Sequence, residues 1–492
     1  MDADVLVIGS GMGGATVAHA LAPTGARVLI LERGERLEDT PATRDLSEVF
    51  AKRSFRPDES WFDGAGKPFA PGNYYLVGGN SKLYGAVLYR YRREDFEGRS
   101  HPDGDAPPWP FPYETLAPFY AEAERLFEVR GDAGPDPTEP PRSAPYPHPP
   151  IPHEPQVADA AERLRAQGLH PAPLPLAVDH EAWLKRARLP WDGLPNPRGA
   201  GKVDAETGPL ESALRHPNVR LLTGVAVDRL VLDGAGRRVE RVEARVAGEA
   251  RTFRAGVVVL SAGAVMSAAI LLRSGAANRS GVVGRHFMNH NTTAMIAGDL
   301  RRRWDTVHSK TLGLNDFYLR DDRTGWPLGN VQLLGKISAP ILRANLAVPA
   351  PLRLLQWLND RSLDWYLMSE DLPRPESRVT VDGARIGLDW RLSNLRAHEA
   401  LVRRMREVFR AAGYPLILTK RFGNKVPSHQ CGTVRMGTDG ATSALDPWCR
   451  AHDHDNLWVV DASCLPTSAA VNPSLTVAAQ ALRAGRRIAA SL

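Results

Sequence analysis

A short glycine-rich turn near the N-terminus constrains the fold of this 492-residue chain more than any other feature. The apolar residues 5–8 predict a buried strand, and GSGMGG follows at once, with Gly9, Gly11 and Gly14 in the spacing G-x-G-x-x-G. Gly9 would permit a tight turn, Gly11 a close approach of the backbone to a pyrophosphate, and Gly14 close packing of helix on strand. The next residues predict a helix from about residue 15 to 21, whose free N–H groups would attract the phosphates.

The strand after this helix ends in an acid. Residues 27–31 predict the strand, and Glu32 follows, 23 residues after Gly9. A carboxylate at this place accepts hydrogen bonds from an adenosine ribose. A glycine-rich turn alone is weak evidence, but turn, helix, second strand and acid together predict a dinucleotide-binding βαβ unit. They do not choose between NAD and FAD.

The composition argues against several other classes of protein. The net charge is only +6, and no basic block with interleaved aromatic residues occurs, so we expect no nucleic-acid partner. Three cysteines without a C-x-x-C pair are typical of a reducing compartment rather than of a disulfide framework or a zinc site. The N-terminus has no signal-peptide pattern, and no apolar run reaches about 18 residues. We therefore expect a cytoplasmic protein with no membrane partner.

The rest of the chain adds a second glycine-containing unit and a distinctive C-terminus. Residues 256–275 predict a buried strand, a turn of small residues and a helix, as in a second wall of a nucleotide-binding domain. Residues 131–155 contain ten prolines and predict an extended loop. Near the end, residues 457–460 predict a buried strand that stops at Asp461, and a helix is expected to begin at Asn472-Pro473. Asparagine is a good helix N-cap, so Asn472 is expected to cap this helix whatever else it does.

These pieces together resemble the glucose–methanol–choline (GMC) oxidoreductases, which bind FAD. The resemblance covers essentially the whole chain and rests on VIGSGMGGATVAHAL with Glu32, VGGNSKLYG, VVLSAGAVMSAAILLRSG, GVVGRHFMNH, HQCGTVRMG and NLWVVDASCLPTSAAVNPSLTVAAQALRA. The form of HQCGTVRMG looks most like the pyranose-oxidase branch, which includes C-glycoside 3-oxidases.

The resemblance implies an α/β fold. It predicts a Rossmann-type FAD-binding domain, similar to that of p-hydroxybenzoate hydroxylase, interleaved with an α+β substrate domain built on an antiparallel sheet. The FAD-binding domain is expected to comprise residues 1–50, 72–130, 195–291 and 428–492. The substrate domain, with its loops and cap, is expected to comprise residues 51–71, 131–194 and 292–427.

The resemblance also implies the residues that hold FAD. They are expected to be Gly9, Gly11, Met12, Gly14, Glu32, Arg33, Gly78, Gly79, Asn80, Ser81, Val227, Ala262, Gly263, Asp461, Ala462, Pro473, Leu475 and Thr476. Some pyranose oxidases attach FAD covalently through a histidine in the segment that matches GGNSKL, but Leu83 stands at that position here. We therefore predict noncovalent FAD.

His429 and Asn472 match the catalytic pair of this branch and lie 43 residues apart, close to the family spacing. Oxidation of an alcohol needs an acceptor for the hydroxyl proton, and a neutral imidazole suits that task. His429 is therefore the expected base, and Asn472 is expected to orient the hydroxyl. A histidine in an apolar segment is more often a packed core residue, and only the surrounding motifs favour catalysis.

Three other groupings of reactive residues are weaker candidates. AHDHD at 451–455 looks like a metal cluster but precedes a buried strand, and His286 and His290 have helical spacing without the glutamate of a zinc protease, so we expect no metal. Cys431 lies two residues from His429, which does not make them a nucleophile and its base. His290 either touches substrate or only packs.

The function that the resemblance implies is FAD-dependent oxidation of a secondary ring hydroxyl, C2 or C3, of a sugar or glycoside, including C-glycosides. The partners would be the sugar or glycoside, O2 or a quinone or artificial acceptor, and a downstream lyase acting on the keto-glycoside. The alternative is a gluconate-type or sterol-type alcohol dehydrogenase that uses a quinone, dye or cytochrome acceptor. A flavoprotein without alcohol oxidation and an NAD-dependent dehydrogenase are further alternatives, although the flavin-facing helix after Asn472 argues against the latter.

Overall fold

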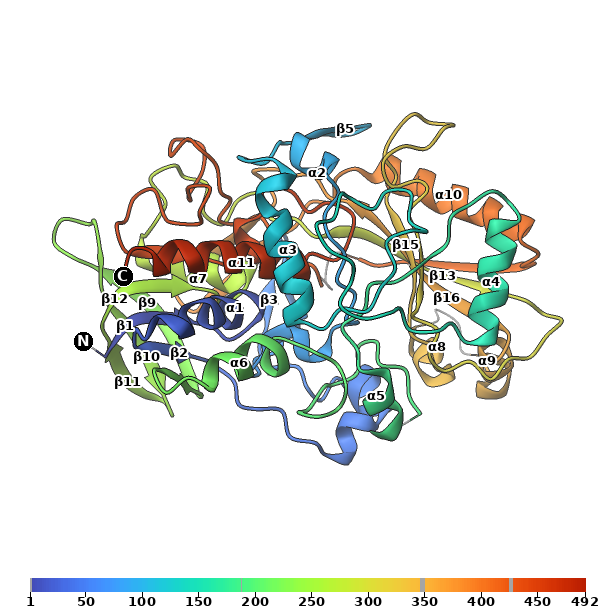
Figure 1. Cartoon of the computed structure of the whole chain (residues 1–492), viewed down its shortest axis with the longest axis horizontal. Coiled ribbons are helices and arrows are strands. Elements are labelled where there is room, and N and C mark those ends of the chain that lie inside the picture. The colour runs from blue at the N-terminus through green and yellow to red at the C-terminus, as the bar shows by residue number, and fades with distance from the viewer. Residues whose placement is uncertain (1, 187, 346–349, 424–427) are drawn as a thin grey trace.

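Two sheets at opposite ends of the molecule organise the structure (Figure 1). The computed structural model describes residues 2–186, 188–345, 350–423 and 428–492. Residues 187, 346–349 and 424–427 of the expected substrate domain and residue 1 of the expected FAD-binding domain lie outside these ranges. Both ends of the chain lie beside the parallel sheet. Among the described residues, no helix combines the length and the apolar character needed to cross a bilayer.

The sheet beside the termini is parallel and has five strands. In spatial order they are β20 (Leu457–Val459), β12 (Ala255–Leu260), β1 (Ala3–Ile8), β2 (Val28–Leu31) and β8 (Val219–Leu222). The central strands β12 and β1 consist largely of buried apolar residues, as expected for strands covered on both faces. This confirms the Rossmann-type fold predicted from the first βαβ unit and from residues 256–275.

Helix α1 (Met12–Leu21) follows β1 directly and packs against the C-terminal helix α11 (Ser474–Ala489) (Figure 1). The helix begins three residues earlier than residue 15, where the sequence predicted its start, because Gly13 and Gly14 are part of its first turn. Gly485 of α11 makes the helix contact close, since a Cβ there would come within 2.6 Å of the Ala20 side chain.

A three-stranded antiparallel sheet and helix α7 lie next to the parallel sheet. The strands are β9 (Val225–Leu232), β10 (Val239–Val246) and β11 (Glu249–Phe253). Helix α7 (Ala264–Ser274) follows β12 and contacts β9. The strand and helix predicted within residues 256–275 are thus confirmed.

The second large sheet is antiparallel and has six strands. In spatial order they are β19 (Leu416–Arg421), β13 (His290–Gly298), β16 (Ser362–Glu370), β15 (Asn330–Leu333), β14 (Leu312–Leu314) and β7 (Ala172–Pro173). Helices α4 (Pro155–Arg165) and α10 (Leu395–Ala411) contribute to the apolar core on one of its faces.

Strand alternation gives this sheet two unlike faces. Val331 and Leu333 of β15 pack into the core with α4 and α10, whereas Asn330 and Gln332 point to the other side. On β16, Trp365 belongs to the same core, and its neighbour Tyr366 lines a cavity between the two large sheets. Around Gln332 and Tyr366 the face away from that core therefore carries polar side chains and is turned toward the cavity, whereas Ile296 of β13 packs into a separate small apolar cluster.

The remaining elements are short or lie around these sheets. Strands β17 (Arg378–Asp382), β18 (Arg385–Asp389), β3 (Trp61–Phe62) and β4 (Pro68–Phe69) form one small sheet, and β5 (Arg99–His101) and β6 (Gly104–Ala106) form another. The other helices are α2 (Glu94–Glu97), α3 (Tyr113–Leu126), α5 (His180–Arg186), α6 (Glu211–Leu214), α8 (Ala339–Asn345) and α9 (Leu352–Asn359). The proline-rich residues 131–154 contain no helix and no strand of their own.

Candidate active site

The glycine turn between β1 and α1 has the geometry that a dinucleotide requires. Gly9 has φ +99°, and a Cβ there would lie 2.3 Å from the carbonyl oxygen of Ser261. Gly14 packs against the carbonyl of Gly9, and a Cβ added to Gly14 would lie 2.0 Å from that carbonyl oxygen. At Gly11, by contrast, an added Cβ would meet no described protein atom within 4 Å. The fold itself leaves Gly11 free, so the space beside it is available to a ligand.

Glu32 anchors this turn from the end of β2. Its Oε2 accepts hydrogen bonds from the N–H and the hydroxyl of Ser10 at 2.9 and 2.7 Å, and its Oε1 accepts from the N–H of Gly34 at 2.9 Å. Burial raises the pKa of this carboxyl, and these donors act in the opposite direction. The neighbouring Arg33 stacks on Tyr75, with its guanidinium carbon 3.8 Å from the ring centroid.

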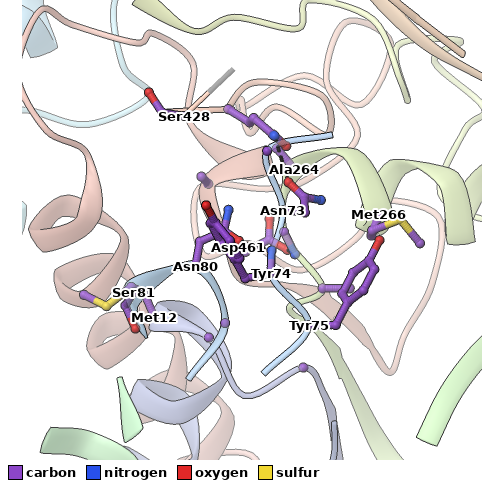
Figure 2. Close-up of a pocket in the computed structure, with 18 of the residues that line it drawn as sticks. Met12, Asn73, Tyr74, Tyr75, Asn80, Ser81, Ala264, Met266, Ser428 and Asp461 are labelled. Carbon is purple, nitrogen blue, oxygen red and sulfur yellow. Dashed lines mark hydrogen bonds between the residues drawn. The ribbon is translucent and has the colours of Figure 1, made fainter. Parts of the chain in front are cut away.

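One long cavity of about 870 Å³ runs from this turn to the polar face of the six-stranded sheet. Figure 2 shows Tyr75, Asn80 and Asp461 among the side chains around it. Of the residues predicted to hold FAD, those that line it are Gly9, Gly11, Met12, Glu32, Arg33, Gly79, Asn80, Ser81, Val227, Ala262, Gly263, Asp461, Ala462 and Pro473.

Four of the residues predicted to hold FAD lie behind this lining. Gly14 packs on the turn, and the N–H of Gly78 donates to the Ser10 hydroxyl at 3.0 Å. Leu475 is fully buried, and the hydroxyl of Thr476 pairs with that of Tyr120 at 2.7 Å. These residues support the wall of the cavity.

The residues present fit FAD. A cavity of this size, a glycine turn with free space at Gly11 and a helix N-terminus at Met12 together suit a dinucleotide with its pyrophosphate at the turn. Leu83, which has no atom able to bond the flavin, lines the cavity, as noncovalent binding requires.

His429 and Asn472 meet at the cavity end beneath the six-stranded sheet. His429 Nε2 lies 3.5 Å from Asn472 Nδ2, and the backbone N–H of His429 donates to Asn289 Oδ1 at 2.6 Å. Burial, assisted by the positive charge of Lys310, lowers the pKa of His429 to about 4. The imidazole is therefore neutral at physiological pH and able to accept a proton.

Asn472 does not cap the C-terminal helix, so that expectation is wrong. Helix α11 begins at Ser474, Pro473 occupies the N-cap position, and no side chain caps it. The Oδ1 of Asn472 instead accepts a hydrogen bond from Gln332 Nε2 at 3.1 Å. A partner from a distant strand has replaced the local cap.

His290 packs behind the base. Its ring lies edge-to-face against that of His429, with centroids 4.8 Å apart and an angle of 84° between the planes. Burial lowers the pKa of His290 well below its usual value, and the residue is absent from the cavity lining. Of the two roles left open by the sequence, packing is the one that this arrangement favours.

Sequence reasoning missed the side chains that the six-stranded sheet and nearby loops bring to this end of the cavity. Lys310 and Asp192 line it and form an ion pair at 2.9 Å, and Tyr366 lines it from β16. Gln332 reaches Asn472 from β15. The alternation of polar and apolar residues in NVQL at 330–333 was the available signal, because it marks a strand with one polar face.

The 451–455 segment, His286, His290 and Cys431 do not line the cavity. Within the described part of the chain, no three histidine, cysteine or acidic side chains gather as they would around a metal ion. In the 451–455 segment, His454 Nε2 accepts from the N–H of Ala277 at 2.8 Å. All three cysteines are buried and free, and burial raises the pKa of the Cys431 thiol well above its usual value, which disfavours a thiolate.

Comparison with known proteins assigns a family to this arrangement. The family model described as GMC oxidoreductase matches residues 193–292 in its N-terminal part and 373–481 in its C-terminal part, and a NAD(P)-binding Rossmann-like model matches residues 7–37. A 6'''-hydroxyparomomycin C oxidase from Streptomyces lividus is 31% identical over 99% of this chain and 92% of its own length. A C-glycoside 3-oxidase from Arthrobacter globiformis is 28% identical over 68% of this chain and 63% of its own.

A solved structure has the same fold. The crystal structure of a pyridoxine 4-oxidase, described as from "Mesorbium loti", superposes with a TM-score of 0.68 at 21% identity and covers 98% of each chain.

Proposed function

Because this chain belongs to the GMC oxidoreductases, which use FAD to oxidise alcohols, we propose that it converts a secondary ring hydroxyl, C2 or C3, of a sugar or glycoside into a ketone. The observation that carries the proposal is the pairing of His429 with Asn472 beneath a polar sheet face. The C-glycoside 3-oxidase relative supports a secondary position. O2 or a quinone-like acceptor would remove the electrons.

We propose the following roles for the residues at the base of the cavity. FAD, when bound, supplies the hydride acceptor. His429 Nε2 accepts the hydroxyl proton as the C–H bond breaks, and Asn472 Nδ2 donates to the same oxygen and orients it. A hydroxyl oxygen placed between two nitrogens 3.5 Å apart can contact both. The N-terminus of α11, lined by Pro473 and Ser474, directs its positive end into the cavity, which favours negative charge there.

We further propose the division of the chain stated from its sequence. The parallel sheet draws its strands from the segments 1–50, 195–291 and 428–492, and the six-stranded sheet draws most of its residues from 131–194 and 292–427. Among the strands of these two sheets in the described ranges, β13 alone crosses a boundary, since it begins at His290. The helical turn Ser47–Lys52 crosses the boundary between residues 50 and 51. The residues that line the cavity on the first side, listed above, would hold FAD.

A second candidate is oxidation of a primary hydroxyl. The Streptomyces lividus relative, which matches nearly the whole chain, is named for a substrate with a 6'''-hydroxyl. The alternative function is that of a gluconate-type or sterol-type alcohol dehydrogenase, which would pass its electrons to a quinone, dye or cytochrome.

The first experiment is anaerobic mixing of the yellow protein with a panel of alcohols. Glucose, xylose, gluconate, a sterol, an O-glycoside and a C-glycoside are compared by the loss of the flavin band near about 450 nm. We expect a sugar or glycoside to bleach it fastest. The 2-deoxy, 3-deoxy and 6-deoxy analogues of the best sugar then decide the position, since the analogue without the reacting hydroxyl fails to bleach the flavin. Recolouring in air separates oxidase from dehydrogenase, and bleaching by the sterol alone contradicts the proposal.

The rate of flavin reduction is expected to fall as the pH drops through about 4. His429 must be neutral to accept a proton, and burial lowers its pKa to about 4, so the rate should stay level at higher pH until another group titrates. If the base were a solvent-exposed histidine, the rate would instead fall at a pH of about 6.5. Anaerobic pH-jump stopped-flow measurements test this. A midpoint near about 6.5 would contradict the assignment of this buried imidazole as the base.

A further inference from the structure

A buried chain of side-chain amides leads away from Asn472. Gln332 Nε2 donates both to Asn472 Oδ1 at 3.1 Å and to Asn330 Oδ1 at 3.2 Å. Asn330 Nδ2 in turn donates to Asn315 Oδ1 at 2.7 Å. Asn330 and Gln332 lie on the polar face of β15, and Asn315 directly follows β14.

This series of hydrogen-bonded amides ends at a buried ion pair. Asn315 Nδ2 donates to Asp136 Oδ2 at 2.7 Å, and the guanidinium of Arg92 donates to the same oxygen at 2.6 Å. Asp136 belongs to the proline-rich loop, so this loop reaches the interior of the protein. Asn315, Asn330 and Gln332 are each at most 1% exposed, so little water can compete for their hydrogen bonds.

The ion pair sets the direction of every amide in this chain. Arg92 can only donate, and the ionised carboxylate of Asp136 can only accept. Asn315 must therefore turn its NH2 group toward Asp136 and its oxygen toward Asn330. The same reasoning fixes Asn330 and then Gln332, whose Nε2 group donates to Asn330 and Asn472. The same Nε2 group also lies 3.8 Å from the sulfur of Met368. The side-chain oxygen of Asn472 therefore accepts the hydrogen bond from Gln332, and its NH2 group faces the cavity.

We propose that Gln332 is a positioning residue that holds the amide of Asn472 with Nδ2 toward His429. The proposal rests on the proposed function, in which these two residues contact the reacting hydroxyl. Because Nδ2 is a donor, it favours the tautomer in which Nε2 of His429 carries no proton. The Arg92–Asp136 pair thus sets the protonation of the His429 ring for proton acceptance through four successive amides, the last of which is that of Asn472.

The tautomer of His429 tests this without any turnover. We would label the fourteen histidines with ¹⁵N, identify His429 by its loss in His429→Gln, and record the ring-nitrogen shifts at neutral pH. The wild type should show an unprotonated Nε2. Gln332→Glu should move the proton to Nε2, because the new carboxylate attracts Nδ2 of Asn472 and turns its oxygen toward His429. An unchanged tautomer in Gln332→Glu, with the protein folded, overturns the proposal.

A double-mutant cycle provides the second readout. Gln332→Met, which keeps the length but removes the donor, should lower the limiting rate of flavin reduction by glucose, or by the best sugar of the panel, about tenfold, the value of one hydrogen bond. Substrate affinity should change less than the rate. In an Asn472→Ala background the same substitution should have no further effect, because Gln332 acts through Asn472. Equal effects in both backgrounds contradict the proposal.

A matched control separates positioning from loss of buried structure. Gln156 of α4 is also buried, and its Nε2 donates to the carbonyl of Ser362, outside the amide chain. Gln156→Met should lower stability without changing the tautomer of His429 or the reduction rate. If His429→Ala reduces its flavin like the wild type, the proposed function fails, and the tautomer experiment still decides the orientation of Asn472.

Discussion

Replacing His429 by alanine is expected to slow anaerobic flavin reduction by about 10²–10⁴-fold while leaving the protein yellow. The large effect follows because the hydroxyl of an alcohol is a very weak acid and its proton needs an acceptor as the hydride leaves. FAD retention is expected because the glycine turn and Glu32 lie at the other end of the cavity from His429. Stopped-flow absorbance measures the rate, and the spectrum of the resting protein measures cofactor content.

Two additions make this result specific. His452→Ala is the matched control, since His452 is hydrogen-bonded to Ser443 outside the cavity and its loss should not change the rate. Free imidazole should partly restore reduction in His429→Ala, because the vacated space adjoins the cavity. A His429→Ala protein with a normal rate would show that another group, or none, accepts the proton.

Gly11→Val is expected to give a folded protein that has lost its FAD. An added Cβ at Gly11 meets no described protein atom within 4 Å, and valine needs no unusual backbone there, since φ is −70°. The side chain would instead fill the space beside the turn that suits a pyrophosphate. The purified variant should be colourless, and added FAD should no longer raise its melting temperature. Ligand at about 100 times its Kd stabilises a protein by about 2.7 kcal/mol, so the wild type should respond clearly.

Gly13→Ala is the contrasting variant. Its Cβ would come within 1.8 Å of the carbonyl oxygen of Val460, next to the end of β20, so the backbone must shift. Overpacking of this kind costs about 1–3 kcal/mol, occasionally more, with or without cofactor. We therefore expect Gly13→Ala to fold poorly, although it adds the smaller side chain, and Gly11→Val to give a stable protein without cofactor. If Gly11→Val stays yellow, the pyrophosphate does not approach this turn.

The nucleotide-binding part of the fold could be predicted because its signals are local. The turn at Gly9, its distance to Glu32 and the small residues after β12 each lie within one supersecondary unit. The start of α1 was placed too late because glycine has low helix propensity. In the structure Gly13 and Gly14 provide close contacts that no larger residue would allow.

The surroundings of the candidate base could not be predicted in the same way. Gln332 and Asn472 lie 140 residues apart, and their contact depends on how β15 is placed in a sheet whose strand order no local pattern reveals. That contact also explains the wrong expectation about the helix cap, because Oδ1 of Asn472 was already engaged. His429 and Asn472 themselves stay predictions, since their roles await the variants above.

The two faces of the six-stranded sheet have a practical consequence for laboratory evolution. Tyr366 and Thr292 reach the cavity, whereas their neighbours Trp365 and Thr293 are turned away from it. A library restricted to positions of the first kind would vary the surface that meets the sugar and leave the core beneath α4 and α10 intact. Alternate residues of the same strands thus determine substrate selectivity and core packing. Selectivity can therefore be varied while the packing that stabilises the fold is left unchanged.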